Sequence, residues 1–337
     1  MLKFEIVENN SESWSEIVKQ AFIYDFHHTA YFHKIDSKFL SKLLLFSDGD
    51  NFIALPIVMR PIDGTDYFDI TSVYGYSGPI FRFNQGYDNS NLKSFFSITF
   101  NEFCKNENIV SVFSRLHPLI DQNLIIGNLG EIIDLNKTVV IDLTKTAEDQ
   151  RKDYRKSLKS ELNQLRRKDV IVKEADTKEE IDDFIEIYYE TMDRVEATAT
   201  YYFSKEYFYE FMDNVDFNAK LLIAIKDNKV IAGAIFTLTD KIMQYHLAGT
   251  IEKYIRETPM KLILDEARLI GNDSSALSLH LGGGVGGSDE DSLFRFKSGF
   301  SKDFKQFSVW KYIVNQQIYD ELSKGKNQAS FFPLYRS

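Results

Sequence analysis

The chain has 337 residues, of which 44% are hydrophobic and 14% aromatic, and its formal net charge is −10 with a pI of about 5.2. This length predicts two domains, and the apolar content excludes a disordered chain. The acidic balance excludes a globally basic nucleic-acid binder but leaves room for a local basic patch.

Short strands and helices alternate in the first half of the chain. Alternating apolar residues predict a strand at the start, and Asn10 or Ser11 caps a helix whose apolar residues have helical spacing. The turn YGYSGPIF occupies residues 74–81. The expected elements are strand Leu2–Glu8, the capped helix, helix Ser37–Phe46, strands Phe52–Met59 and Tyr67–Tyr74, helix Leu92–Lys105, and strands Ile109–Ser114, Glu131–Ile133 and Thr138–Leu143.

The second half repeats this order of elements. The expected elements are strand Val170–Glu174, helices Lys178–Asp193 and Lys205–Met212, strands Leu221–Lys226, Val230–Leu238 and Ile242–Ala248, helix Pro259–Ile270, and strands Ala276–Leu281 and Lys305–Val314. The pattern predicts the α/β (α+β) class with two tandem domains, residues 1–150 and 151–337. Each domain should hold a mixed, largely antiparallel sheet flanked by helices.

A basic segment joins the two halves. Residues Arg151–Lys168 contain eight Lys or Arg against two acids. Tyr154, Leu158, Leu162 and Leu165 form one helical stripe, which predicts an amphipathic helix with a basic outer face. Such a face is either solvated or a surface for a phosphate-bearing substrate or an RNA end.

Near the C-terminus, HLGGGVGGSDEDSLFRFKSGF (280–300) packs five of the 17 glycines into six positions. Gly282, Gly284 and Gly287 have the G-x-G-x-x-G spacing of a dinucleotide site, but only one further strand follows, so no βαβ unit is completed. The acidic run 289–291 would also repel a phosphate. The glycines are therefore interpreted as a bend where backbone approaches a ligand.

Other site chemistries find little support. Cys104 is the only cysteine, which excludes an internal disulfide and a cysteine-rich metal site, and no G-x-S-x-G signature is present. His27, His28 and His33 lack a second acidic cluster to complete a metal shell, so no metal is expected. Lys297 follows two phenylalanines, and an apolar environment would make it a base with a depressed pKa or a partner for an oxyanion. Otherwise it is an exposed lysine on a short helix.

Several segments resemble the FemAB/FemX-like branch of the GNAT acyltransferases. HLGGGVGGSDEDSLFRFKSGF is similar to the strand, glycine turn and F-K-x-G-F that end the second domain of that branch. DFHHTAYFHK (25–34) resembles its D-x-x-H-T-x-x-Y/F-H segment, and YGYSGPIF resembles its Y-G-Y-x-G-P turn. PMKLILDEA (259–267) looks like the helix before the last core strand. The resemblance extends over most of the chain.

The resemblance implies transfer of an acyl or aminoacyl group to an amine of a sugar nucleotide or cell-envelope precursor, as in cell-wall or polysaccharide biosynthesis. In the cross-bridge enzymes of the branch a Phe-Lys pair lies beside the tRNA acceptor end, and the matching positions are Phe296 and Lys297. The catalytic candidates are Lys297, Tyr245 and His246. The other substrate-binding candidates are Gly282, Gly283, Gly284, Tyr74, Tyr76, His28, Tyr31, Arg155, Lys156 and Lys159.

The donor stays open between acyl-CoA (acetyl-CoA above all) and aminoacyl-tRNA. The pyrophosphate loop R/Q-x-x-G-x-G/A is missing before Pro259, where the chain reads EKYIRETPMK, and this departure puts CoA in doubt. The acidic total charge argues against tRNA. The alternative is a non-catalytic module that binds a glycan or protein through the aromatic segment 198–211. The longest apolar run, FIALPIVM, is too short to span a bilayer, and no signal peptide is recognisable, so we expect a cytoplasmic location. Nothing in the sequence indicates an oligomeric state.

Overall fold

The computed structural model describes residues 1–284, 291–327 and 331–337. Two compact units are present, which we call unit 1 (Met1–Asn136 with Gln306–Ser337) and unit 2 (Lys137–Lys305). The division differs from the expected domains 1–150 and 151–337. It falls inside two long strands, β7 (Glu131–Asp142) and β13 (Asp303–Ile313), which each contribute residues to both units, and the end of the chain returns to unit 1.

In unit 1 the strands follow the order β1-β2-β3-β4-β6-β13, with β5 on β3. Neighbours are antiparallel except for β4 and β6, which are parallel. The strands are β1 (Leu2–Glu8), β2 (Leu40–Asp48), β3 (Asn51–Pro61), β4 (Phe68–Thr71), β5 (Ile80–Arg82) and β6 (Ile109–Arg115).

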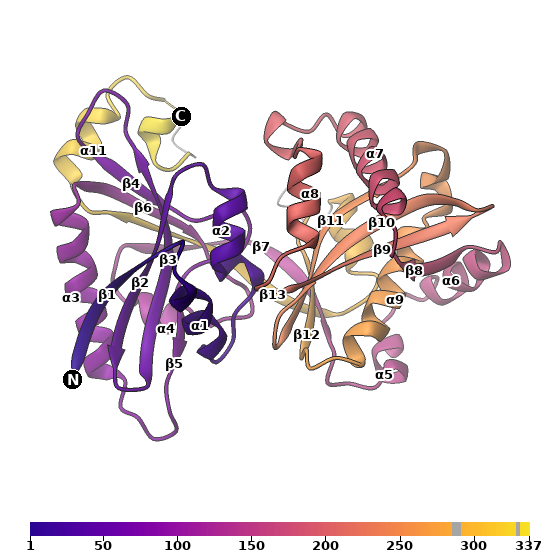
Figure 1. The fold of residues 1–337 in the computed structure, drawn as a ribbon, viewed down its shortest axis with the longest axis horizontal. Helices are drawn as coiled ribbons and strands as arrows, with labels where there is room; N and C mark the ends of the chain where they lie inside the picture. Colours follow the sequence, from indigo (N-terminus) through magenta and orange to yellow (C-terminus); the bar gives the residue numbers. More distant parts are fainter. Residues whose placement is uncertain (285–290, 328–330) are drawn as a thin grey trace. The chain divides into compact units, whose positions relative to one another are not determined.

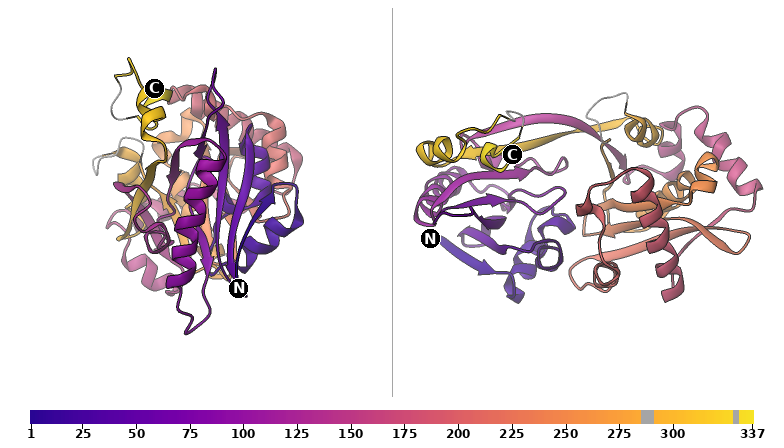
Figure 2. Two further views of the ribbon diagram at one scale, coloured as in Figure 1. Left: turned by 90° about the vertical axis from the view of Figure 1, so that its left-hand side faces the viewer. Right: turned by 90° about the horizontal axis from the view of Figure 1, so that it is seen from above.

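The helices of unit 1 cover both faces of its sheet. They are α1 (Glu12–Gln20), η1 (Phe26–His28), α2 (Ala30–Asp36), α3 (Ser90–Asn106), α4 (Asn123–Ile126), α11 (Gln316–Leu322) and η4 (Leu334–Arg336). Helix α3 lies along one face of the sheet (Figure 2). Its Phe96 and Phe100 pack in a core with Trp310. Helix α1 buries Trp14 and Val18 in a second core, together with Leu43 and Phe52 of the sheet. Ala30 of α2 belongs to the same core.

One predicted element of unit 1 is wrong. The helix expected at Ser37–Phe46 is strand β2, which pairs antiparallel with β1 on one edge and with β3 on the other. Its leucine-rich run satisfies helical and extended spacing equally, so pairing on both edges decides its structure. The two short strands expected at Glu131–Ile133 and Thr138–Leu143 are one strand, β7.

Unit 2 repeats the arrangement with the order β7-β12-β11-β10-β9-β8. Here β11 and β12 form the parallel pair, and the other neighbours are antiparallel. The strands are β8 (Ile171–Glu174), β9 (Asn218–Lys226), β10 (Lys229–Leu238), β11 (Ile242–Thr250) and β12 (Ser278–Gly282). Each unit therefore holds a largely antiparallel sheet with one parallel pair, which confirms the predicted fold class.

The helices of unit 2 also lie on two faces. They are α5 (Ala147–Lys152), α6 (Leu158–Arg167), α7 (Lys178–Arg194), η2 (Ala199–Tyr201), α8 (Lys205–Met212), η3 (Glu252–Glu257), α9 (Met260–Asn272) and α10 (Ser292–Lys297). Helices α7 and α8 pack on one face of the sheet, while α9 and α6 pack on the other (Figure 1). None of the helices in the described part of the chain has the length and apolar character of a membrane span.

The basic segment is two helices, so the single helix expected over Arg151–Lys168 is wrong. The chain turns between α5 and α6, where the Arg155 N–H donates to the Gly299 carbonyl (2.8 Å) and the Tyr154 hydroxyl donates to Asp265 Oδ1 (2.7 Å). These tertiary hydrogen bonds offset the intrahelical ones that are lost. The apolar stripe from Tyr154 to Leu165 is buried against the sheet, as the spacing predicts.

Candidate active site

Strands β11 and β12 separate in the middle of unit 2. Their parallel pairing runs from Ile242 opposite Ser278 to Gln244 opposite His280, and stops there. On its outer side β11 shifts register against β10 next to His246, and β12 shifts register against β7 between His280 and Gly282. Each strand thus has an irregular pairing with its outer neighbour just beyond the last pair of the parallel ladder. We call the diverging segments, 245–247 and 281–283, the fork.

Lys297 lies at the fork. It is the last residue of α10, a helix capped by Asp291, whose carboxylate accepts the Phe294 N–H (2.8 Å). The Lys297 side chain is buried, and its Nζ donates to the Gly283 carbonyl at 2.7 Å. The same Nζ lies 5.5 Å from the centre of the Tyr245 ring. The lysine therefore contacts both arms of the fork.

The surroundings of Lys297 disfavour its charge. Burial lowers the pKa of the Lys297 ammonium to about 7, although the Asp291 carboxylate opposes this effect. The Tyr245 ring face favours the cation, as expected for a cation–π contact. Burial also raises the pKa of the Tyr245 phenol above its ordinary value. At neutral pH the site thus holds an amine present in both protonation states beside a phenol that keeps its proton.

The glycines before α10 satisfy packing demands. Gly282 has φ +74°, a conformation that favours glycine. A Cβ on Gly284 would lie 2.2 Å from Asp291 Oδ1, and one on Gly283 would lie 3.2 Å from the Lys137 carbonyl oxygen. Only glycine lets the backbone lie this close to the Asp291 carboxylate. The last glycine of the G-x-G-x-x-G spacing, Gly287, lies outside the described residues.

The three catalytic candidates do not meet in one place. Tyr245 packs with the core under α9, on the side of Lys297. His246 faces the opposite side, where its ring stacks on Phe211 of α8 with 4.9 Å between centroids. Phe296 is half-buried and packs edge-on against Phe300 at 5.9 Å. The structure thus joins Lys297 with Tyr245 and separates both from His246.

The basic candidates lie in the turn between α5 and α6. The Arg155 guanidinium binds both carboxylate oxygens of Glu161, at 3.1 and 2.9 Å. Lys156 and Lys159 are exposed, and neither takes part in an ion pair among the described residues. Because the Arg155 N–H donates to Gly299, two residues after Lys297, this basic turn adjoins the end of α10.

A second polar cluster, in unit 1, includes residues that the sequence did not single out. Asp25 Oδ2 accepts hydrogen bonds from His27 Nδ1 (2.8 Å) and His117 Nε2 (3.1 Å), and all three side chains are buried. The nearby histidines hold the pKa of the Asp25 carboxyl far below its usual range, although burial opposes this. Gly75 (φ +118°) leaves room for His27, since a Cβ there would lie 2.0 Å from Nε2. Only the D-x-H spacing of Asp25 and His27 could have revealed the cluster, because His117 lies far along the chain.

The candidates of unit 1 surround this cluster. Tyr76 lies edge-on to His27 and to His117, with 5.8 Å between centroids in each case. His28 is buried, and its Nδ1 hydrogen-bonds the backbone of Asp25, so it serves the local fold. Tyr74 is exposed under the Arg115 guanidinium at 5.1 Å, and Tyr31 is half-buried on α2.

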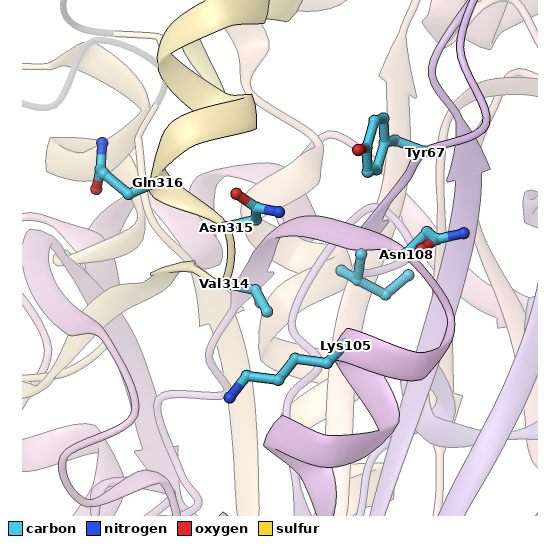
Figure 3. Close-up of a pocket in the computed structure, with 7 residues that line it drawn as sticks. Tyr67, Lys105, Asn108, Val314, Asn315 and Gln316 are labelled. Atoms are coloured by element: carbon cyan, nitrogen blue, oxygen red, sulfur yellow. The ribbon is translucent and has the colours of Figure 1, made fainter.

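Two further features bear on ligands. Among the described residues no group of three His, Cys, Asp or Glu side chains could hold a metal ion. A pocket of about 370 Å³ lies in unit 1, beside the first residue of β6. It is lined by Tyr67, Lys105, Asn108, Ile109, Val314, Asn315 and Gln316 (Figure 3). None of the predicted site residues lies in it.

Comparison with known proteins identifies the fold. No protein-family model matches the sequence, and no curated protein matches it significantly. The crystal structure of FemX superposes with a TM-score of 0.75 at 12% identity, covering 95% of this chain and 99% of FemX. The chain has the fold of FemX. This confirms the fold that the sequence resemblance implied.

Two other solved structures share the FemX fold. L-PGS from Bacillus licheniformis has a TM-score of 0.61 at 12% identity, covering 92% of this chain and 94% of that one. The C-terminal domain of a putative lysylphosphatidylglycerol synthetase from Agrobacterium fabrum has a TM-score of 0.57 at 12% identity, covering 91% and 93%. At these identities the likeness establishes the fold.

Proposed function

We propose that this protein is an N-acyltransferase that moves an acyl or aminoacyl group onto an amine of a sugar nucleotide or cell-envelope precursor. The observation that carries the proposal is Lys297, a buried amine that contacts both arms of the fork. The FemX fold supports it, because a transferase of this kind is what the sequence motifs imply. The proposal assigns the reaction to the fork of unit 2.

The chemistry fits the groups present. The acceptor nitrogen attacks the acyl carbonyl carbon and forms a C–N bond, while the bond to the thiol or ribose oxygen of the donor breaks. The nitrogen must lose a proton, and the carbonyl oxygen becomes transiently negative. Lys297 as a free amine accepts that proton, whereas Lys297 as an ammonium stabilises the oxyanion. Its pKa of about 7 makes both forms available near neutral pH.

The fork also offers a place for an extended donor. Beyond Gln244 and His280, the described parts of β11 and β12 make no strand pairing with each other. Backbone N–H and C=O groups on such inner edges suit a chain that carries amides, as acyl-CoA does. Against CoA, the segment before α9 lacks glycine and forms the turn η3, after which Thr258 adopts φ +57°. This keeps aminoacyl-tRNA as the second donor.

The tRNA donor predicts that the basic turn binds phosphates. Replacing Lys156 and Lys159 together with Gln should weaken tRNA binding and reduce the slope of log K against log salt by about 1.4–1.8, because each lysine that neutralises a phosphate contributes roughly 0.7–0.9. Filter binding between about 50 and 200 mM salt measures this slope. Lys229→Gln, an exposed lysine in the β9–β10 hairpin, is the matched control. An unchanged slope in the double variant argues for a solvated face and against tRNA.

The surface expected for the non-catalytic alternative is partly buried. In the aromatic segment 198–211, Tyr207, Phe208 and Phe211 are buried within unit 2, whereas Tyr202 is exposed. Phe208 packs edge-on against Phe184 and Tyr188 of α7. The buried rings therefore belong to the core, and only the rest of the segment remains for a partner.

The proposal is tested by a donor and acceptor screen read by mass spectrometry. Acyl-CoAs and charged tRNAs are paired with amino-sugar nucleotides, and the product is the acceptor plus the mass of the acyl group. Wild-type protein should form such a product with one donor class, and Lys297→Met should not. If no pair of donor and acceptor yields a product with wild-type protein, the non-catalytic alternative holds.

A further inference from the structure

We infer that Gln244 and His280 are positioning residues that hold the fork between β11 and β12 open and thereby fix Lys297 beside Tyr245. The inference rests on the proposed function for its catalytic consequence. The structural part of the inference rests only on the hydrogen bonds and the register of the two strands.

The pair occupies the last rung of the parallel ladder. Gln244 of β11 and His280 of β12 are direct neighbours in register. Gln244 Oε1 accepts a hydrogen bond from His280 Nδ1 at 2.6 Å, and Gln244 Nε2 donates to the carbonyl oxygen of Tyr245 at 3.0 Å. The amide therefore ties β12 to β11 and also engages the first backbone carbonyl of β11 beyond the ladder.

These hydrogen bonds fix the state of both groups. A carboxamide oxygen only accepts, so Nδ1 of His280 carries the hydrogen that it donates. The amide NH₂ is then turned toward Tyr245, which sets the orientation of Gln244. The Tyr245 carbonyl, the first one of β11 beyond the ladder, is thereby engaged by a side chain of β11 itself at the point where the strand pairing ends.

Both side chains of the pair are buried inside the sheet. Gln244 is 3% exposed and His280 is fully buried, in a row that continues to Thr237 of β10, the register partner of Gln244. Polar groups inside a sheet cost free energy that apolar residues of the same volume would not. The hydrogen bonds that the pair makes at the end of the ladder offset this cost. The register shifts on the outer sides of both strands begin within two residues of the pair.

The pair lies next to the backbone of both arms of the fork. Tyr245 follows Gln244 directly, and Gly283 lies three residues after His280. Lys297 contacts both Tyr245 and Gly283. A change in the angle of the fork would therefore move the two anchors of the lysine apart and admit water beside Nζ.

The test replaces Gln244 with Met, which keeps the length of the side chain and removes both hydrogen bonds. We expect kcat to fall by about 100-fold with KM little changed, because a displacement of about 1 Å at a reacting group has effects of that size. We also expect the titration midpoint of Lys297 to rise from about 7 toward its ordinary value of 10.5, since water relieves the burial that lowers it. The midpoint is measured by pulse acetylation of Lys297 at a series of pH values, read by peptide mass spectrometry.

Three more variants sharpen the result. Gln244→Leu also removes both hydrogen bonds without adding a charge, and it replaces Gln244→Met if the latter does not fold. His280→Asn retains a side-chain N–H and should recover most of the kcat that His280→Phe loses. Equal losses of kcat in the two variants would overturn a positioning role. Thr237→Val changes the direct neighbour of Gln244 in the same buried row but keeps both hydrogen bonds of the amide, and it should leave the Lys297 midpoint unchanged.

The two readouts separate the inference from the proposed function. If wild-type protein shows no transfer with any donor, the proposed function fails, and the labelling midpoint of Lys297 still decides whether the pair positions it. A midpoint in Gln244→Met equal to that of the wild type overturns the inference, whatever the activity.

Discussion

Replacing Lys297 with Met lowers kcat for acyl transfer by about 10²–10⁴-fold, the range in which a positioned proton-transfer group contributes. The thioether keeps most of the buried stem, so the melting temperature should stay at that of the wild type or rise, because a buried amine that favours its neutral form does not stabilise the fold. Steady-state kinetics and differential scanning calorimetry on the same preparation check both halves of the expectation. Wild-type turnover in this variant would remove Lys297 from the mechanism.

The pH profile then assigns the role of Lys297. If the free amine accepts the proton, kcat rises with pH through a midpoint of about 7 and levels off above it. If the ammonium stabilises the oxyanion, kcat is constant at low pH and falls through the same midpoint. Lys297→Arg adds an independent criterion, since a guanidinium stays charged throughout this range and cannot act as a base. Partial activity of the Arg variant supports the oxyanion role, and complete loss supports the base.

The sequence singled out Lys297 but left open whether its side chain is buried or exposed. The structure shows it buried beside the Gly283 carbonyl, and its catalytic role stays a prediction. The Gln244–His280 pair had no local signal, because its members meet only through the register of two parallel strands joined by α9. The separation of Tyr245 from His246 follows from the same cause: adjacent residues of a strand face opposite sides.

The errors in unit 1 have a similar origin. Strand β2 was predicted as a helix because an apolar run fits both periods, and its partners β1 and β3 decide the outcome. In DFHHTAYFHK the motif directed attention to His28, whereas the carboxylate of Asp25 binds His27 and, from far along the chain, His117. The order of elements was predictable from composition and period, while contacts between distant segments were not.

Acidification should destabilise unit 1 through His28 and His33. Burial lowers the pKa of each imidazole from 6.5 to about 3. Between these values the unfolded chain binds the two protons and the folded chain does not, so the free energy of unfolding falls as pH falls, by up to about 2.7 kcal/mol per pH unit for the two groups. Asp36 acts in the opposite sense, because burial raises the pKa of its carboxyl to about 6 and the folded state takes up that proton first.

Replacing His33 with Phe isolates one of these contributions. His33 is 1% exposed, and its ring lies 5.1 Å from that of Trp14, so an apolar ring fits its surroundings. Relative to the wild type, the variant should gain about 1.4 kcal/mol of unfolding free energy for each pH unit between about 6 and 4, because one proton fewer is bound on unfolding. Both tryptophans, Trp14 and Trp310, belong to unit 1, so their fluorescence in urea titrations reports this unit by itself.

Phe32→Leu is the matched control, since it shortens a buried ring on the same helix without removing a titratable group. It should lower stability by the same amount at every pH, giving a curve parallel to that of the wild type. Parallel curves for His33→Phe would show instead that His33 takes up its proton in the folded state as readily as in the unfolded one. The neutral, buried form of His33 would then be excluded, and the acid sensitivity of unit 1 would have to come from other groups, such as His28 and the Asp25 carboxylate. That group is paired with His27 and His117, and it loses its stabilising effect only at lower pH, as the carboxylate takes up its proton.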